Sequence, residues 1–350
     1  MAKKDKILVV IPYKSSFIMN DIKIISSQYD IILNSYNWKN KFYVPFFLVL
    51  QFLAMFKYLR RARLILIEFG GYWALVPSIL GKVFNIPVLI VLHGTDCASM
   101  PHIQYGNLRK KVLRLACKVS YNLATALLPV SDSLIYTKND YNTEDIYQGV
   151  RHHFPNTKTP FEVIHNGLDT EFWKPIGNVI REDNRFIAVF SQAQFILKGG
   201  DLIMALAEKF PDRNFYIAGI DAPQNLSNTS KNVHFLGKLS KEELREEFEK
   251  STFHLQLSMY EGFGLALCEA MLCECIPIGS SVNIIPEIIG DTGFILQKKD
   301  MAQLADVIEK ADAVENKVEL GQKARKHIMD NFSLKKKEEL LLNTINSFVN

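Results

Sequence analysis

The most informative stretch of the chain is Glu261-Gly262-Phe263-Gly264-Leu265-Ala266-Leu267-Cys268-Glu269-Ala270-Met271. An apolar run at 253–257 precedes it, and a segment of helical period follows its glycines. The glycines let the backbone approach a ligand closely and adopt positive φ. The helix behind them points free N–H groups and the positive end of its dipole at that ligand. The stretch therefore predicts an anion site, for which a diphosphate is the natural occupant.

Two carboxylates flank this turn, Glu261 before the glycines and Glu269 about one turn into the helix. A carboxylate beside a diphosphate would repel it. We therefore expect both to accept hydrogen bonds from hydroxyl groups, one from a sugar and one from a ribose. Taken alone, the stretch fits a plain glycine turn with capping glutamates better, so the context has to decide between the two.

The rest of the chain alternates short apolar runs with longer helical segments. The runs expected to form buried strands lie at 6–11, 30–33, 63–67, 88–92, 126–130, 161–164, 186–190, 214–218, 233–235, 253–257, 276–278 and 293–296. Helical segments include 72–84, 108–124, 200–210, 241–251 and 265–273, and Ser240 with Glu243 forms a capping box. Such alternation predicts two doubly wound α/β domains with parallel sheets, joined near 166–184.

The context of the turn resembles the retaining GT-B glycosyltransferases of family 4 (glycosyl transferases group 1). Members share a glutamate, seven residues and a second glutamate, which are Glu261 and Glu269 here. The resemblance spans most of the chain and is dense from 161 to 333. Further matching words occur in the same order along the chain: His93-Gly94-Thr95-Asp96, Val130-Ser131-Asp132-Ser133, Asn166-Gly167-Leu168-Asp169, Lys198-Gly199-Gly200, Ile285-Pro286-Glu287-Ile288 and Phe332-Ser333.

The resemblance implies a GT-B fold, in which two Rossmann-like domains face each other across a cleft. It implies an N-terminal acceptor domain over 1–168 and a C-terminal nucleotide-sugar donor domain over 169–332. The amphipathic segment 333–350 would form a helix that packs back toward the first domain.

The resemblance also assigns roles to matching residues. Lys198 would neutralise the diphosphate, Glu261 would lie near the sugar, and Glu269 would hold the ribose hydroxyls. The backbone of Gly262, Phe263, Gly264 and Leu265 would hold the phosphates or the sugar. His93 would face the donor sugar, with a core histidine as the alternative. Asp96 is a weaker candidate for the acceptor hydroxyl, and an N-cap role suits it as well.

Two departures from the family pattern affect the donor site. Members usually carry an arginine about five residues before the lysine, where this chain has Ala193. One phosphate-binding cation is therefore missing unless Lys14 or an arginine from elsewhere replaces it. Many members also have a Gly-Gly turn after the first strand, whereas the loop here is Pro12-Tyr13-Lys14-Ser15-Ser16-Phe17.

The function implied is transfer of a sugar, with retention, from a nucleotide diphosphate sugar to a glycan or lipid-linked acceptor in cell-surface polysaccharide biosynthesis. No metal cofactor is expected, because no Asp-x-Asp occurs and no His, Asp and Glu have ligand spacing. Three alternatives stay open: a sugar-nucleotide epimerase or phosphorylase on this fold, a nucleotide- or glycan-binding relative without turnover, and a dehydrogenase. The last lacks a Gly-x-Gly-x-x-Gly after the first strand.

Charge is distributed unevenly along the chain. Residues 1–165 hold 20 basic and 10 acidic residues, whereas residues 166–350 hold 21 and 27. The apolar run 44–56 is too short to span a bilayer, and it predicts a buried helix or one that dips into a membrane surface. Basic residues at 57–63 follow it directly. Five cysteines without paired spacing and the lack of a signal peptide predict a cytoplasmic protein. The apolar run and the basic residues after it predict that the protein could bind the inner face of the plasma membrane. No nucleic-acid partner is expected.

Overall fold

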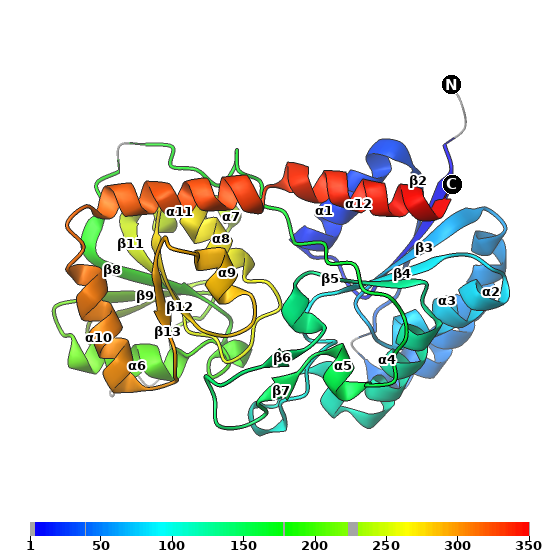
Figure 1. The fold of residues 1–350 in the computed structure, drawn as a ribbon, viewed down its shortest axis with the longest axis horizontal. Coiled ribbons are helices and arrows are strands. Elements are labelled where there is room, and N and C mark those ends of the chain that lie inside the picture. Colours follow the sequence, from blue (N-terminus) through cyan, green and yellow to red (C-terminus); the bar gives the residue numbers. More distant parts are fainter. Residues whose placement is uncertain (1–3, 39, 178, 223–229, 350) are drawn as a thin grey trace. The chain divides into compact units, whose positions relative to one another are not determined.

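The computed structural model describes residues 4–38, 40–177, 179–222 and 230–349, and the chain divides into two units. Unit 1 comprises Met1–Lys138, Tyr147–Asn166 and Lys335–Asn350, and unit 2 comprises Asn139–Ile146 and Gly167–Leu334. Each unit is a parallel sheet covered by helices (Figure 1). The chain passes between the units four times, so neither unit is a single continuous segment.

The sheet of unit 1 has five parallel strands in the order β2-β1-β3-β4-β5. Their bounds are Asp30–Ser35 for β2, Lys6–Ile11 for β1, Ala62–Glu68 for β3, Val88–Leu92 for β4 and Ala126–Pro129 for β5. The three central strands are almost wholly buried, as continuous Ile, Val and Leu runs require when helices cover both faces. A two-stranded antiparallel ribbon, β6 (Thr137–Lys138) with β7 (Tyr147–Gln148), lies apart from this sheet.

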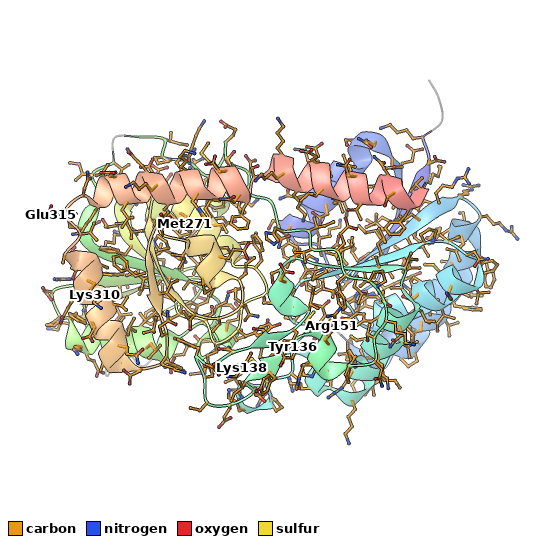
Figure 2. The ribbon with its side chains drawn as sticks, viewed as in Figure 1. Tyr136, Lys138, Arg151, Met271, Lys310 and Glu315 are labelled. Atoms are coloured by element: carbon orange, nitrogen blue, oxygen red, sulfur yellow. The ribbon has the colours of Figure 1, made fainter. Side chains whose placement is uncertain are left out.

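Helices cover both faces of this sheet. One layer consists of α2 (Val44–Leu59), α3 (Tyr72–Val83) and α4 (Lys111–Leu123), in which α3 contacts both neighbours. The other contains α1 (Ser16–Gln28) and α12 (Leu334–Val349), which lie side by side in Figure 1. The short α5 (Val150–His153) follows β7, and Figure 2 labels Arg151 on it. Single 3-10 turns occur at η1 (Lys41–Tyr43), η2 (Pro101–Ile103), η3 (Asn107–Arg109) and η4 (Asp132–Leu134).

The sheet of unit 2 has six parallel strands in the order β10-β9-β8-β11-β12-β13. Their bounds are Val233–Gly237 for β10, Asn214–Ala218 for β9, Glu182–Val189 for β8, Ser251–Gln256 for β11, Ile276–Ser280 for β12 and Phe294–Leu296 for β13. Stacked rings of Phe186, Phe215 and Phe253 tie the three central strands together, with centroids 4.8 and 5.3 Å apart.

Six α-helices of the described part surround this sheet. On one side α8 (Leu265–Leu272) packs on α7 (Lys241–Lys250) and α11 (Lys317–Asn331), and on the other α6 (Gly200–Lys209) packs on α10 (Met301–Asp312) (Figure 1). Two short helical elements complete the unit: η5 (Gln192–Gln194) follows β8, and α9 (Ile285–Ile289) follows β12. Ser240 caps α7 as expected: its hydroxyl accepts from the Glu243 N–H at 3.2 Å, and the Glu243 carboxylate accepts from the Ser240 N–H at 2.7 Å. The prediction of two doubly wound α/β folds is confirmed.

The strand expected at 161–164 is wrong, and so is the fully buried helix that was one of the two alternatives for 44–56. Residues 161–164 form no strand; only Phe161 makes a single parallel bridge, to Leu127 of β5. The apolar run 44–56 does form a helix, but α2 is not buried all round. Val44, Gln51, Met55 and Leu59 face the core, whereas Phe46, Val49, Phe52, Leu53 and Phe56 are exposed. No helix in the described part of the chain is long and apolar enough to cross a membrane.

The last helix of the chain, α12, belongs to unit 1. Its Lys337 is only 4% exposed and forms an ion pair with the equally buried Asp21 of α1. The same ammonium donates to Asn166 Oδ1 at 3.1 Å. Further along, Thr344 donates to Glu162 and Tyr29 donates to Asn346. These contacts attach α12 to unit 1, in which its Lys337 supplies the cation that the buried Asp21 carboxylate needs.

We expect Lys337→Met to destabilise unit 1 by about 3 kcal/mol, because the variant leaves the Asp21 charge buried without its partner. Lys336→Met is the matched control, since Lys336 is exposed on the same helix and should change stability by less than about 0.5 kcal/mol. Urea unfolding of both variants measures the difference. Asp21→Asn combined with Lys337→Met should recover part of the loss; equal effects of Lys337→Met and Lys336→Met would contradict a stabilising role for this ion pair.

Candidate active site

Both sheets reverse their strand order at one point, and chemistry-bearing residues collect there. In unit 2 the reversal lies between β8 and β11, and in unit 1 between β1 and β3. The loops that leave the carboxyl ends of such strands diverge and leave a crevice for a ligand. Lys198 follows β8, and Glu261 follows β11.

Lys198 and Glu261 form an ion pair in unit 2, although they are 63 residues apart. Glu261 Oε2 also accepts from Gln256 Nε2 at 2.7 Å and from the Ser258 hydroxyl at 3.2 Å. The Glu261 N–H donates to Asn283 Oδ1 at 3.1 Å. Both charged side chains keep some exposure, 14% for the lysine and 12% for the glutamate. The ammonium is therefore positioned by a held carboxylate while an incoming anion can still reach it.

Glycine at the start of two helices leaves their N-termini free of side-chain caps. Gly199 precedes α6 with φ 74°, and a Cβ there would lie 2.5 Å from the Leu257 carbonyl oxygen. Gly264 precedes α8 with φ 96°. Neither helix has a side-chain cap, although the first N–H of α6, that of Gly200, donates to the Phe195 carbonyl oxygen at 2.8 Å. The two positive helix ends and the Lys198 ammonium make the region suited to a diphosphate.

Glu269 lies one turn into α8 with a half-buried side chain. No residue of the described chain donates a hydrogen bond to its carboxylate. Burial raises the pKa of Glu269 to about 8, and the charge of Lys241 opposes this rise. A desolvated carboxyl with open acceptor positions is suited to hydroxyl groups of a ligand rather than to a structural role.

In unit 1, His93 follows β4 and meets Glu68, the last residue of β3. The two side chains are 4% and 0% exposed, and His93 Nε2 lies 2.7 Å from Glu68 Oε2. Burial lowers the pKa of His93 to about 4 and raises the pKa of Glu68 to about 7, an increase that Lys337 opposes. The imidazole is therefore neutral near pH 7, with Nδ1 left without a partner among the described residues.

Aromatic rings enclose the imidazole. The ring of Phe69 lies 4.2 Å and that of Phe17 4.8 Å from the His93 ring, centroid to centroid. Tyr13 packs on Phe69 at 5.6 Å and is 45% exposed. Phe69 has φ 62°, a left-handed conformation that costs a bulky residue energy and that tends to occur at functional sites. The loop 12–17, which lacks the expected glycines, thus contributes the rings of Tyr13 and Phe17 to the surroundings of His93 and Phe69.

Asp96 has a structural role in the unliganded structure. It is fully buried, and its carboxylate accepts backbone N–H groups from Gly70 at 2.8 Å, Gly94 at 3.0 Å and His93 at 3.1 Å. It therefore fixes the loops after β3 and β4, and its oxygens are already engaged. The structure favours this supporting role over the acceptor-hydroxyl role and over a helix N-cap.

The sequence identified most of these residues but missed several supports. It indicated Lys198, Glu261, Glu269 and His93 and the backbone of Gly262, Phe263, Gly264 and Leu265. The structure pairs Lys198 with Glu261, and it places all of these residues except His93 in unit 2. It missed Glu68, although a glutamate ending an apolar strand was a usable signal. It also missed Gln256, Ser258 and Asn283, which carry no motif. Ala193 lies exposed in η5, so that position supplies no cation.

Metal ligands do not cluster in the described part of the chain: no group of three or more His, Cys, Asp or Glu side chains there could hold an ion. All five cysteines are free and buried.

Residues 175–327 match the family model of the glycosyl transferases group 1. The N-acetyl-alpha-D-glucosaminyl L-malate synthase of Bacillus anthracis is 28% identical over 274 residues, which cover 72% of this chain and 65% of that protein. One component of the human phosphatidylinositol N-acetylglucosaminyltransferase is 28% identical over 160 residues, 43% of this chain and 33% of the relative. The matched segments thus span less than two thirds of these relatives' lengths.

Solved structures share the fold at low identity. The sucrose-phosphate synthase of Thermosynechococcus elongatus superimposes with a TM-score of 0.76 at 15% identity, over 99% of this chain and 98% of the other. Anabaena Alr3699/HepE in complex with UDP and glucose gives a TM-score of 0.71 at 16% identity, over 98% and 100%. The resemblance to group 1 glycosyltransferases and the GT-B fold type are confirmed.

Proposed function

Because residues 175–327 of this chain match the family model of the glycosyl transferases group 1, we propose that it is a retaining, metal-independent glycosyltransferase. It transfers a sugar from a nucleotide diphosphate sugar to a glycan or lipid-linked acceptor, in the synthesis of a cell-surface polysaccharide. The observation that carries the proposal is the cluster at the β8–β11 reversal, in which Glu261 pairs with Lys198, and both residues shortly precede a helix that has no side-chain cap. Two of its relatives are named for making N-acetylglucosaminyl products.

The cluster suits the charge change of glycosyl transfer. The C1–O bond to the donor phosphate breaks, and the leaving diphosphate gains negative charge. The Lys198 ammonium and the helix N-termini stabilise that charge in a partly water-excluded site. The acceptor oxygen forms its bond to C1 on the same face of the sugar, and its proton passes to the departing phosphate oxygen. No carboxylate nucleophile is needed, which agrees with a Glu261 already engaged by three donors.

The remaining site residues take the other ends of the donor. Glu269 holds the ribose hydroxyls, for which its unoccupied acceptor positions are suited. The backbone from Gly262 to Leu265 lines the sugar and phosphates. His93, kept neutral by burial and oriented by Glu68, hydrogen-bonds a sugar hydroxyl through its second ring nitrogen.

A relative that binds the nucleotide without turnover is the second candidate. Ala193 favours it, because the exposed methyl leaves Lys198 without a neighbouring cation from η5. Donor-dependent release of the nucleotide diphosphate separates the two candidates, since a binding protein releases none.

We expect Lys198→Ala to lower kcat by roughly 10²–10³, equivalent to about 3–4 kcal/mol of transition-state stabilisation. The reason is that Lys198 carries the charge stabilisation that a second cation would otherwise share. Lys310→Ala is the matched control; Lys310 lies on α10 (Figure 2) and is exposed, so its removal should leave kcat unchanged. Release of nucleotide diphosphate in the presence of acceptor is the measurement. A folded Lys198→Ala protein with near-normal kcat would place the phosphates elsewhere.

Binding of a bare nucleoside diphosphate should release protons near neutral pH. Hydroxyl donors favour the ionised form of Glu269, whose pKa burial raises to about 8, so affinity should rise with pH up to that value. The slope should approach tenfold per pH unit below pH 8. Calorimetry in two buffers of different ionisation enthalpy measures the released protons. Glu269→Gln should bind more weakly and lose this proton release; an unchanged proton count in that variant would assign the linkage to another group.

We also propose that unit 1 binds an anionic membrane surface on the cytoplasmic side, where a lipid-linked acceptor would be presented. Phe46, Val49, Leu53 and Phe56 lie on α2 at spacings of three and four, so they share one face, and each is 41–61% exposed. The helix contains no acidic residue. An exposed apolar stripe of this kind is unusual on a freely soluble protein and typical of a helix lying in the interface. Five free thiols are typical of a reducing compartment.

Basic residues adjoin one end of this stripe. Arg60, Arg61 and Arg63, together with Phe56 and Phe84, line a cavity of about 820 Å³. Arg63 is 3.3 Å from Asp5, whereas Arg60 and Arg61 have no ion-pair partner in the described part of the chain. An arrangement with apolar side chains beside unpaired guanidinium groups fits lipid tails beside anionic headgroups.

We expect the protein to sediment with vesicles that contain anionic lipid at low salt, and to be released at high salt, because each basic residue contributes on the order of 1 kcal/mol at the surface. Leu53→Glu should abolish this binding. Val318→Glu is the control, as Val318 is similarly exposed on α11 of unit 2. Equal sedimentation of both variants, or no binding of the wild type to anionic vesicles, would rule out α2 as the contact.

A further inference from the structure

A cavity of about 300 Å³ lies in unit 1 between α4 and the segment that follows α5. It shares no residue with the His93 and Glu68 pair or with the exposed stripe of α2. Lys111, Arg114, Lys118 and Asn122 occupy one face of α4 at spacings of three and four and form one wall. Residues 153–157 form the other wall.

The lining carries three cations and no carboxylate. Lys111 and Lys118 have no ion-pair partner in the described part of the chain, and their side chains are exposed. Arg114 is held in place: its Nη2 donates to the His153 carbonyl oxygen at 3.2 Å, and its guanidinium lies 5.8 Å from the Phe154 ring centre. Cations that gather around a cavity without a compensating acid attract an anion.

Two polar groups of the lining, the His153 imidazole and the Thr157 hydroxyl, are shielded from solvent. The pKa of His153 is lowered to about 4, by burial first and then by His152 and Arg114. Its Nε2 lies 3.0 Å from Gln148 Oε1. The hydroxyl oxygen of Thr157 is shielded from solvent and has no hydrogen-bond partner, which is costly unless a ligand or a water supplies one.

The lining is not only charged. Leu115, Phe154 and Pro155 supply apolar surface, and Asn122 and Asn156 supply amide groups that suit hydroxyls. The volume exceeds what a single phosphate group fills and lies at the lower end of small-ligand pockets. Flat apolar faces, amides and cations together match a sugar ring that carries an acidic group.

We propose that this cavity is a second ligand site, which binds an acidic saccharide through a phosphate or carboxylate held by Lys111, Arg114 and Lys118. Two sources share this chemistry, a free sugar phosphate and an acidic residue of a glycan chain. The site lies outside the donor cluster, so its occupancy can be measured whether or not the protein transfers sugar.

The test is calorimetric titration of the full chain at low salt with glucose 6-phosphate, with inorganic phosphate and glucose as reference probes. We expect saturable binding of glucose 6-phosphate that is at least tenfold tighter than that of either reference. Lys111→Glu combined with Lys118→Glu should weaken it at least tenfold. Lys335→Glu combined with Lys336→Glu changes the net charge equally on exposed positions of α12 and should change affinity less than twofold.

A local readout separates this site from binding beside Lys198. Glucose 6-phosphate should raise the pKa of His153, followed by its imidazole NMR resonance, because an anion offsets the charge of Arg114. The source follows from a galacturonate tetramer: tighter binding than glucose 6-phosphate indicates a glycan chain, and weaker binding indicates a free sugar phosphate. Equal affinity for inorganic phosphate, equal loss in both double variants, or an unmoved His153 resonance would overturn the proposal.

Discussion

The adjacency of β8 and β11 in the parallel sheet of unit 2 is the constraint on which the candidate site depends. It brings Lys198 and Glu261 into an ion pair across 63 residues of chain. The strand order reverses at this point, so the loops after β8 and β11 lead away from each other. The connections to the neighbouring strands therefore do not cover the ion pair. Three donors share one oxygen of Glu261, and this fixes the carboxylate more firmly than the flexible lysine that it holds. The cation can therefore exchange its partner for a phosphate while its surroundings stay in place.

The candidate site residues of unit 1 are part of a set of buried ionisable groups. Four of these groups have almost no exposed side-chain surface: Glu68, His93, Asp96 and Asp21. Burial raises the pKa of the three carboxyl groups and lowers the pKa of the imidazole, so it favours the neutral form of each. The Lys337 cation opposes this shift in both Glu68 and Asp21. Since Lys337 comes from the last helix of the chain, the protonation of the His93 and Glu68 pair depends on a residue more than 240 positions away.

The basic character of the N-terminal half resolves into two separate surfaces. One is the apolar stripe of α2 with the arginines at its end, and the other is the cavity beside α4. Both helices belong to the layer that also contains α3, so they cover the same face of the unit 1 sheet. The first combines exposed phenylalanine with unpaired arginine, as a bilayer surface requires. The second combines cations with amides and an unpartnered hydroxyl, as a small polar ligand requires.

Local pattern alone was sufficient for the succession of most strands and helices along the chain, for the Ser240 cap and for a glycine turn before the helix that begins at Leu265. Each depends on residues within about ten positions of one another, where apolar period, glycine and capping chemistry act directly. The strand expected at 161–164 failed because an apolar run becomes a strand only when a neighbour pairs along its length, and only Phe161 makes a bridge. The sequence also could not predict which side chains of α2 are exposed, because apolar residues occur on every face of this helix and helical period does not show which face the core covers. The partners of Lys198, His93 and Lys337 come from distant segments, so the pairing of these charges was determined by strand order and by the return of the last helix.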